Sequence, residues 1–173
     1  RVGVQPPVMD DGSEPIRLTT HNARADEVNN RKMAGLPGDP YSFVAQVDGD
    51  FPESAYPAEE ELQLKPGAQV MFIRNDPEGN YYNGKLAKVE KISDGVVTVS
   101  DSEGRLIDVN PVEWPNAQYE LDDESGEICQ NVIGTFRQIP LRVAWAITIH
   151  KSQGLTFDNV IIDAGAAFAF GQV

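Results

Sequence analysis

The chain has 173 residues, of which 27 are acidic and 14 are basic, and its formal net charge is −13. This excess of acid argues against a strongly basic nucleic-acid-binding protein and predicts that the chain alone binds nucleic acid weakly. No apolar run approaches the roughly 18 residues of a transmembrane helix, so no membrane partner is expected, and the single cysteine, Cys129, excludes an internal disulfide and suits a reducing, cytoplasmic location.

The first forty residues predict the start of an α/β domain. Residues 1–15 are rich in proline and predict a loop or an incoming linker. Residues 16–20 predict a short strand. A helix is expected next, with Asn22 as its N-cap and its end near Leu36, where Gly35 and two prolines interrupt it.

The middle of the chain, residues 41–117, predicts a small all-β module. Residues 41–47 alternate between apolar and other side chains, and an acidic loop follows to about residue 61. Several strand-length segments then lie between turns that contain Gly, Asn or Asp, at 68–74, 86–92, 95–100 and 105–109. Short strands at this spacing predict a small curled sheet or barrel.

From residue 118 the chain returns to longer apolar segments. Strands are expected at 128–139, 141–145 and 160–163, with a polar turn before the last one. Such a pattern is typical of a parallel α/β sheet. We therefore expect an α/β domain in two pieces, residues 1–40 and 118–173, with the β module 41–117 inserted between them.

Two segments have part of the pattern of a nucleotide site. Residues 79–85 match the spacing G-x-x-x-x-G-K of a P-loop, but Leu86 replaces the hydroxyl residue that holds magnesium, and a strand is expected to follow instead of a helix. A β-hairpin is the favoured interpretation. Residues 160–163 resemble a Walker-B strand, but Ala164 follows Asp163 where a second acid is usual. No complete nucleotide site is present.

The polar turn at residues 148–154, within the segment 146–158, is the strongest local signal. Gly154 allows a ligand to approach the backbone closely. A loop that only connects two strands does not need many polar side chains, although a capped short helix exposed to solvent would also explain them. Five side chains able to hold a phosphate or a sugar fall within six positions: Thr148, His150, Lys151, Ser152 and Gln153.

These residues resemble a known family. The run Trp145-Ala-Ile-Thr-Ile-His-Lys-Ser-Gln-Gly-Leu-Thr-Phe157, with Asp163 and Gly171-Gln172 beyond it, is similar to the motif V region of superfamily 1 DNA helicases. It is most similar to the RecD-like 5′-to-3′ group. Residues 65–76, followed by Asn83-Gly84, resemble the segment that enters a small barrel in the second motor domain of that family. Residues 18–22 resemble its motif IV corner. Together these matches span about residues 16–172.

The resemblance implies both a fold and a role. The fold is expected to be α/β, a partial RecA-like parallel sheet of the second motor domain with an inserted small all-β Src-homology-3-like barrel. The chain would be a fragment of an ATP-dependent DNA helicase, a single-strand translocase, and inactive alone. ATP and Mg²⁺ would serve the full-length protein. Its partners would be single-stranded DNA and the missing upstream RecA-like motor domain.

The resemblance also implies roles for individual residues. The polar turn would couple the grip on DNA to ATP at the cleft between the two motor domains. No catalytic residue and no metal ligand is expected in this chain. The expected DNA contacts are Thr148, His150, Thr20, Asn22, Arg74 and Asn75. The expected ATP-binding residues are Lys151, Gln153 and Gly154.

Two other functions stay open. One is a non-catalytic module that binds nucleic acid or protein, centred on the β-barrel, with the α/β part as its scaffold. The other is an autonomous nucleotide hydrolase that uses residues 79–85. Among single residues, Trp114 and Trp145 are expected to pack in the interior, Cys129 to be a small buried hydrophobe, and His21 to be a surface or capping residue.

Overall fold

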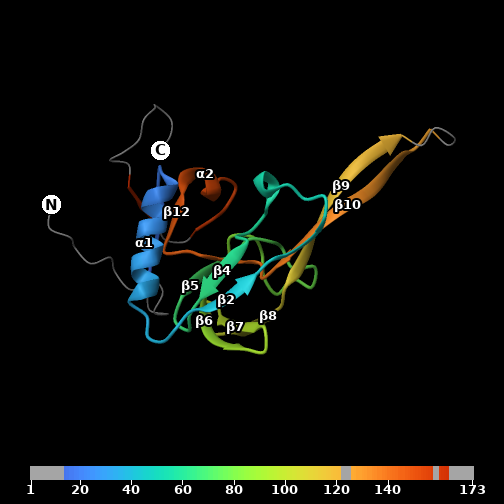
Figure 1. Cartoon of the computed structure of the whole chain (residues 1–173). Helices are drawn as coiled ribbons and strands as arrows, with labels where there is room; N and C mark the ends of the chain where they lie inside the picture. Colours follow the sequence, from blue (N-terminus) through green and yellow to red (C-terminus); the bar gives the residue numbers. More distant parts are fainter. Residues whose placement is uncertain (1–13, 122–125, 158–159, 164–173) are drawn as a thin grey trace.

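The computed structural model describes residues 14–121, 126–157 and 160–163. Figure 1 shows a helical region beside an antiparallel β region, and a long two-stranded arm that leads away from both. No helix among the described residues is long and apolar enough to span a membrane.

A three-stranded parallel sheet joins distant parts of the chain. β1 (Ile16–Thr19) lies between β12 (Ala146–Thr148) and β13 (Val160–Ile162), and all three strands run parallel. α1 (Asn22–Ala34) follows β1 and packs against β12, and the short α2 (Ile149–Ser152) follows β12. The prediction of α/β structure with a parallel sheet is confirmed for these elements.

The N-terminal end of α1 differs by one residue from the prediction. Asn22 is the first helical residue, and His21 occupies the N-cap with extended backbone (φ −127°, ψ 136°). The prediction that Asn22 caps the helix is therefore wrong. The helix ends at Ala34, where the N–H of the C-cap Gly35 donates to the carbonyls of Arg31 and Lys32 at 3.2 Å.

The largest sheet is antiparallel and has five strands in the order β11-β5-β6-β7-β8. It confirms the four strands predicted between residues 68 and 109. The β6–β7 connection is the expected tight turn, since Asp94 and Gly95 both have positive φ angles of 52° and 78°. The strands are β5 (Gln69–Phe72), β6 (Leu86–Ser93), β7 (Val96–Ser100), β8 (Leu106–Val109) and β11 (Leu141–Val143).

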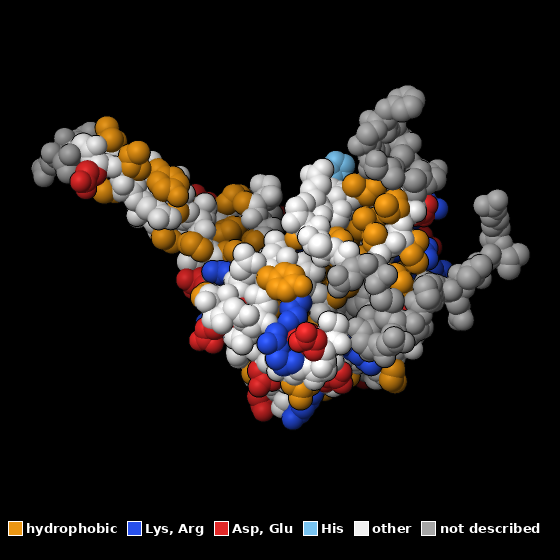
Figure 2. Space-filling model, turned by 180° about the vertical axis from the view of Figure 1, so that it is seen from behind, with side chains coloured by type: hydrophobic (Ala, Val, Ile, Leu, Met, Phe, Trp, Pro, Cys, Tyr) orange, Lys and Arg blue, Asp and Glu red, His pale blue; other side chains and the backbone are white. Residues whose placement is uncertain are grey.

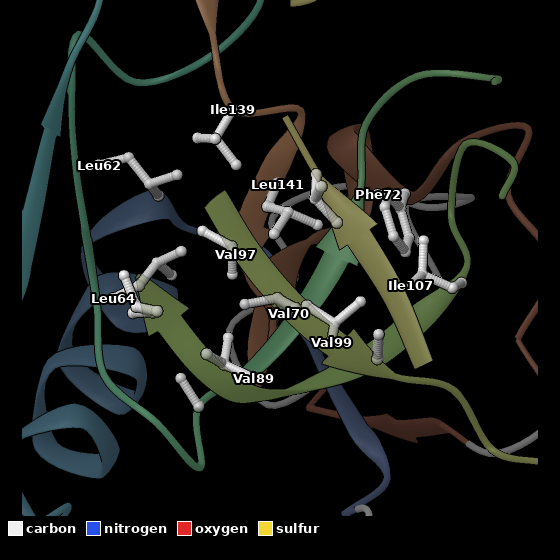
Figure 3. Close-up of a cluster of buried hydrophobic side chains, with 14 of the residues drawn as sticks. Leu62, Leu64, Val70, Phe72, Val89, Val97, Val99, Ile107, Ile139 and Leu141 are labelled. Atoms are coloured by element: carbon white, nitrogen blue, oxygen red, sulfur yellow. The ribbon is translucent and has the colours of Figure 1, made fainter. Parts of the chain in front are cut away.

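Alternate residues of these strands form the main hydrophobic core (Figure 3). In β7, Val97 and Val99 are fully buried while their neighbours are half-buried, as the two-residue period of a strand requires. β4 (Glu61–Leu64) adds two buried leucines and pairs with β2 (Tyr41–Val44). Trp145 also belongs to this core, which confirms its predicted packing role. Burying one aliphatic side chain of this core stabilises the folded state by about 1.5–3 kcal/mol.

The alternating segment 41–47 contributes to two strands. β2 pairs with β4, whereas β3 (Gln46–Gly49) pairs with β10. Between them, the N–H of Ala45 donates to the carbonyl of Glu60 at 2.7 Å. The alternating pattern continues through this exchange of partners, so the sequence does not reveal it. Further along the acidic loop lies the short 3₁₀ helix η1 (Glu53–Ala55).

The arm consists of β9 (Val112–Leu121) and β10 (Ile128–Gln138), which are antiparallel (Figure 1). The prediction that the strands from 128 to 145 belong to a parallel sheet is wrong, because β10 pairs with β9 and β11 with β5, both antiparallel. Cys129 is exposed on the arm, contrary to its expected burial. β9 contains no apolar run, because its apolar residues alternate with polar ones and change side along the strand.

A second, smaller core joins the two sheets. Ile16 and Ile147 of the parallel sheet are buried against Met71 of β5. Leu155, which follows the polar turn, packs on the same cluster. It also lies against Gly84 (φ +97°), where an added Cβ would come within 3.1 Å of the Leu155 Cδ2 atom. The antiparallel part therefore fixes the position of the chain that leaves the turn.

Candidate functional site

The carboxyl ends of the three parallel strands meet at one edge. Thr19 of β1 pairs in register with Thr148 of β12. On the other side of β1, the N–H of Asp163 donates to the carbonyl of Leu18 at 2.9 Å. Ligands of open α/β sheets bind beyond the carboxyl ends of the strands. This edge is therefore the candidate site.

The polar turn begins at this edge and forms a capped short helix. Thr148 is only 5% exposed, and its Oγ1 accepts the N–H of Lys151 at 3.4 Å. Ser152 Oγ donates to the carbonyl of Ile149 at 2.7 Å. These bonds hold the turn from within. Its exposed residues are His150, Lys151, Gln153 and Gly154.

Gly154 has a backbone conformation that explains its identity. Its φ of +77° lies in the left-handed region, which other residues adopt only at a cost. An added Cβ would meet no atom within 4 Å, so crowding is not the reason for glycine here. The exposed hydrogen-bond donors of the nearby Lys151 and Gln153 remain accessible to a ligand.

Two further predicted residues lie at the same edge. Thr20 directly follows β1, and its Oγ1 is 2.8 Å from His21 Nδ1. Asn22 is exposed in the first turn of α1. The neighbouring Thr19, which the sequence analysis missed, is buried and donates its hydroxyl to the carbonyl of His21 at 2.9 Å. Its importance comes from its register with Thr148, which no local pattern reveals.

Asn29 is a second residue that the sequence analysis missed. Its Nδ2 donates to the carbonyl of Ala146, and its Oδ1 accepts the Ala146 N–H, both at 2.8 Å. β12 is an edge strand of the parallel sheet. The amide of Asn29 therefore satisfies the open side of the strand that leads into the turn, and ties α1 to it. A polar residue in a helix gives no advance sign of this role.

The acid that resembled a Walker-B residue has a cationic partner. Asp163 Oδ2 lies 3.4 Å from Arg24 Nη1 of α1. Within the described residues, no group of three or more His, Cys, Asp or Glu side chains is placed to hold a metal ion. Asp163 is thus paired with α1 through Arg24.

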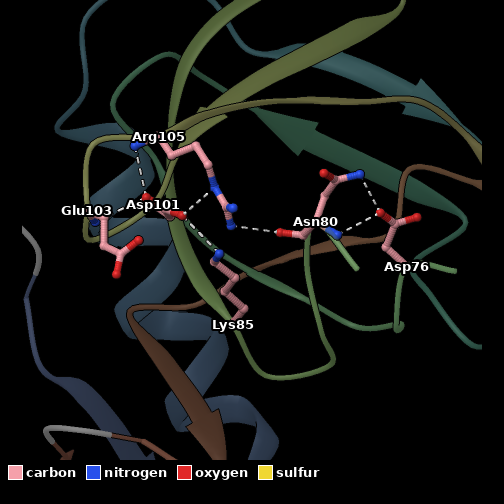
Figure 4. Close-up of polar contacts among 6 residues, drawn as sticks. All are labelled: Asp76, Asn80, Lys85, Asp101, Glu103 and Arg105. Atoms are coloured by element: carbon pink, nitrogen blue, oxygen red, sulfur yellow. Dashed lines mark hydrogen bonds and ion pairs between the residues drawn. The ribbon is translucent and has the colours of Figure 1, made fainter. Parts of the chain in front are cut away.

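Residues 79–85 form a loop that leads into a strand, which confirms the hairpin interpretation over the P-loop. Lys85 Nζ donates to Asp101 Oδ2 at 2.9 Å, as Figure 4 shows. Burial opposes ionisation of Asp101, but the bonds from Lys85 and from the backbone N–H groups of Arg105 and Glu103 outweigh it and lower the pKa of Asp101 from 3.8 to about 2. Lys85 thus joins the loop 79–85 to the loop between β7 and β8 and stabilises both.

Arg74 and Asn75 lie in the antiparallel part and not at the edge of the parallel sheet. The Arg74 guanidinium donates to the carbonyl of Glu113 and lies 5.3 Å from the centre of the Trp114 ring. Asn75 Oδ1 accepts the N–H of Asn83 at 2.8 Å. Trp114 is half-buried and packs on Phe136, in keeping with its expected role. Arg74 therefore fixes the base of the arm.

The chain is similar to known helicases. The UvrD-like helicase C-terminal domain family matches residues 143–172, which include the polar turn. The ATP-dependent DNA helicase Pif1 of Psychrobacter sp. (strain PRwf-1) is 30% identical over 207 aligned residues, which cover 90% of this chain and 31% of the relative.

Solved structures agree with this similarity. The unliganded Pif1 from Bacteroides sp is 39% identical with a TM-score of 0.86, over 96% of this chain and 39% of that one. The Bacteroides Pif1 bound to ssDNA is 42% identical with a TM-score of 0.76, over 92% and 36%. The chain thus spans 31–39% of the length of these proteins. The predicted resemblance to superfamily 1 DNA helicases is confirmed.

Proposed function

We propose that this chain, a relative of the Pif1-type superfamily 1 helicases, is part of an ATP-dependent DNA helicase and supplies the turn that couples its grip on single-stranded DNA to ATP. One observation carries the proposal. The register of Thr19 with Thr148 puts the polar turn and the start of α1 at one carboxyl edge. The helicase family match covers the same turn.

The exposed side chains of the turn support a division of roles. His150, with Thr20 and Asn22 nearby, would offer hydrogen-bond donors to the DNA backbone. Thr148 is nearly buried, so its contact with DNA would be limited to a hydroxyl whose oxygen already accepts a backbone N–H. In the antiparallel part, Arg74 and Asn75 would form the second DNA contact.

On the other side of the turn, Lys151, Gln153 and Gly154 would border the ATP cleft. Lys151 and Gln153 are exposed, and they supply the donors that a phosphate needs. An upstream RecA-like motor domain would supply the rest of the ATP site. The described residues do not form a metal centre by themselves, so Mg²⁺ would be held elsewhere in the complete helicase, and we assign it no step here.

We also propose a three-part organisation, with the five-stranded antiparallel sheet as the inserted Src-homology-3-like barrel. The adjacency of β1 and β12 supports an insertion, since the chain between them leaves the parallel sheet and returns to it. The sequence predicts the parts as residues 1–40, 41–117 and 118–173. The pairing of β11 with β5 supports extending the inserted part to residue 143.

The decisive experiment measures ATP hydrolysis, with and without single-stranded DNA, by the complete polypeptide that contains this chain. We expect His150→Ala and Thr148→Ala to reduce the stimulation by DNA, and Thr148→Ser, which keeps the capping oxygen, to preserve it. Unchanged stimulation in both alanine variants would refute the role of the turn. The 173-residue chain alone should not turn over ATP; turnover abolished by Lys85→Ala would favour the hydrolase alternative.

A further inference from the structure

The arm has one hydrophobic face that is exposed to solvent. Residues directly opposite in an antiparallel pair share a face. Tyr119 is 72% exposed and Ile128 is 73% exposed. The pairs on this face are Leu121 with Ile128, Tyr119 with Gln130, and Ala117 with Val132. The pairs on the opposite face are polar or small: Glu120 with Cys129, and Gln118 with Asn131.

The face of the ribbon that carries the hydrophobic residues is not the same at the base of the arm and in its far part. At the base, Trp114 lies on the same face of β9 as Gln118 and Glu120. Its partner Phe136 packs against Phe51. Beyond the bulge between Val132 and Gly134, the hydrophobic residues lie on the other face. The apolar face of the far part of the arm is therefore not a continuation of the internal core. Figure 2 shows hydrophobic side chains along the arm, away from the rest of the molecule.

A two-stranded ribbon by itself is marginally stable in water. An extended ribbon with a mostly apolar, exposed face is typical of an interaction surface. We propose that this face, formed by Leu121, Tyr119, Ala117, Ile128 and Val132, docks on an apolar protein surface bordered by Lys or Arg, carried by another domain of the same polypeptide.

The charge of the arm supports a protein partner over nucleic acid. Glu120, on the opposite face of this thin ribbon, and Glu127 lie toward its far end and are exposed. The only basic residue within β9 and β10 is Arg137, near the base. Phosphates would be repelled from the far end, whereas Lys or Arg at the border of a protein surface would be attracted.

Size and net charge argue against a second copy of this chain. The face offers six residues, counting Gln130, whereas a stable interface uses about 20–30 residues on each side. Two copies would also bring together net charges of −13 each. A small surface is sufficient within one polypeptide, because the linkage raises the effective concentration of the partner. In this one respect the inference rests on the proposed function, which places the chain in a longer helicase.

The test replaces Tyr119 by the photo-cross-linker p-benzoylphenylalanine in the complete polypeptide. Gln118, on the opposite face of the same strand, is the matched control position. We expect a cross-link from position 119, and none from position 118, to a segment of the same polypeptide outside these 173 residues. That segment should be apolar with Lys or Arg beside it. Adding Ile128→Asp should abolish the cross-link.

Other outcomes would overturn the inference. Cross-links between copies would identify a dimer contact, cross-links to added single-stranded DNA would identify a nucleic-acid surface, and no cross-link would leave the face without a partner. DNA-stimulated ATP hydrolysis is measured on the same samples. Normal hydrolysis without the cross-link would reject the docking surface alone, whereas a cross-link in a polypeptide without hydrolysis would reject the proposed function alone.

Discussion

The antiparallel sheet and the carboxyl edge of the parallel sheet use their residues in different ways. The first encloses a large core of fully buried side chains and a nearly buried ion pair between Lys85 and Asp101. The second exposes polar side chains on a helix of four residues. Loops that carry function are commonly positioned by a rigid scaffold. The comparison therefore predicts that substitutions in the sheet alter stability, and that substitutions at the edge alter coupling.

Phe72→Ala should give the largest loss of stability. Phe72 is fully buried in β5 and stacks on Tyr81, with ring centres 4.1 Å apart. Removing a buried aromatic side chain leaves a cavity and costs about 3–5 kcal/mol. Urea unfolding followed by circular dichroism measures this loss. Val44→Ala, at a position 72% exposed on β2, is the control and should cost much less. Similar losses in the two variants would contradict the assigned core.

Asp101→Asn should cost about 2 kcal/mol near neutral pH, from the lowering of the Asp101 pKa from 3.8 to about 2. Because this pKa is lower in the folded state, the stabilisation is complete above pH 3.8 and is lost as the pH falls toward 2. The free energy of unfolding, measured in urea between pH 7 and 2, should show this loss in the original chain and not in the variant. Glu103→Gln keeps the backbone N–H that binds Asp101 and is the control. An identical pH dependence in Asp101→Asn would contradict the assignment.

Asn29→Ala should have a smaller and more local effect. The substitution removes both hydrogen bonds to Ala146, each of which contributes about 0.5–1.5 kcal/mol. Amide hydrogen exchange at Ala146 should become faster, while exchange in β6 and β7 should change little. The exposed neighbour Asn30 offers the matched control Asn30→Ala. Equal acceleration in both sheets would mean that the edge and the antiparallel part open as one unit.

Local signals predicted the features that depend on neighbouring residues. Asp94-Gly95 predicted the β6–β7 turn, and the polar composition of 148–154 predicted the exposed turn. Features set by distant partners were not predictable. The change of partner at Ala45 and the register of Thr19 with Thr148 depend on chain segments about 15 to 130 residues away. β9 was missed for a related reason, because its hydrophobic face changes side along the strand.

Lys151→Ala separates the two regions most clearly, because its expected effect on stability is the smallest. Lys151 is exposed, and only its backbone N–H bonds to Thr148, so the free energy of unfolding should stay within about 0.5 kcal/mol. In the complete polypeptide Lys151→Ala would remove the proposed hydrogen bond to a phosphate, worth about 1.5–3 kcal/mol, and should reduce DNA-stimulated ATP hydrolysis about 10–150-fold. Lys91→Ala, at an exposed position of β6, is the matched control and should leave both quantities unchanged. If Lys151→Ala instead lowered stability as much as Asp101→Asn and left hydrolysis intact, the turn would belong to the scaffold, and the functional difference between the two regions would disappear.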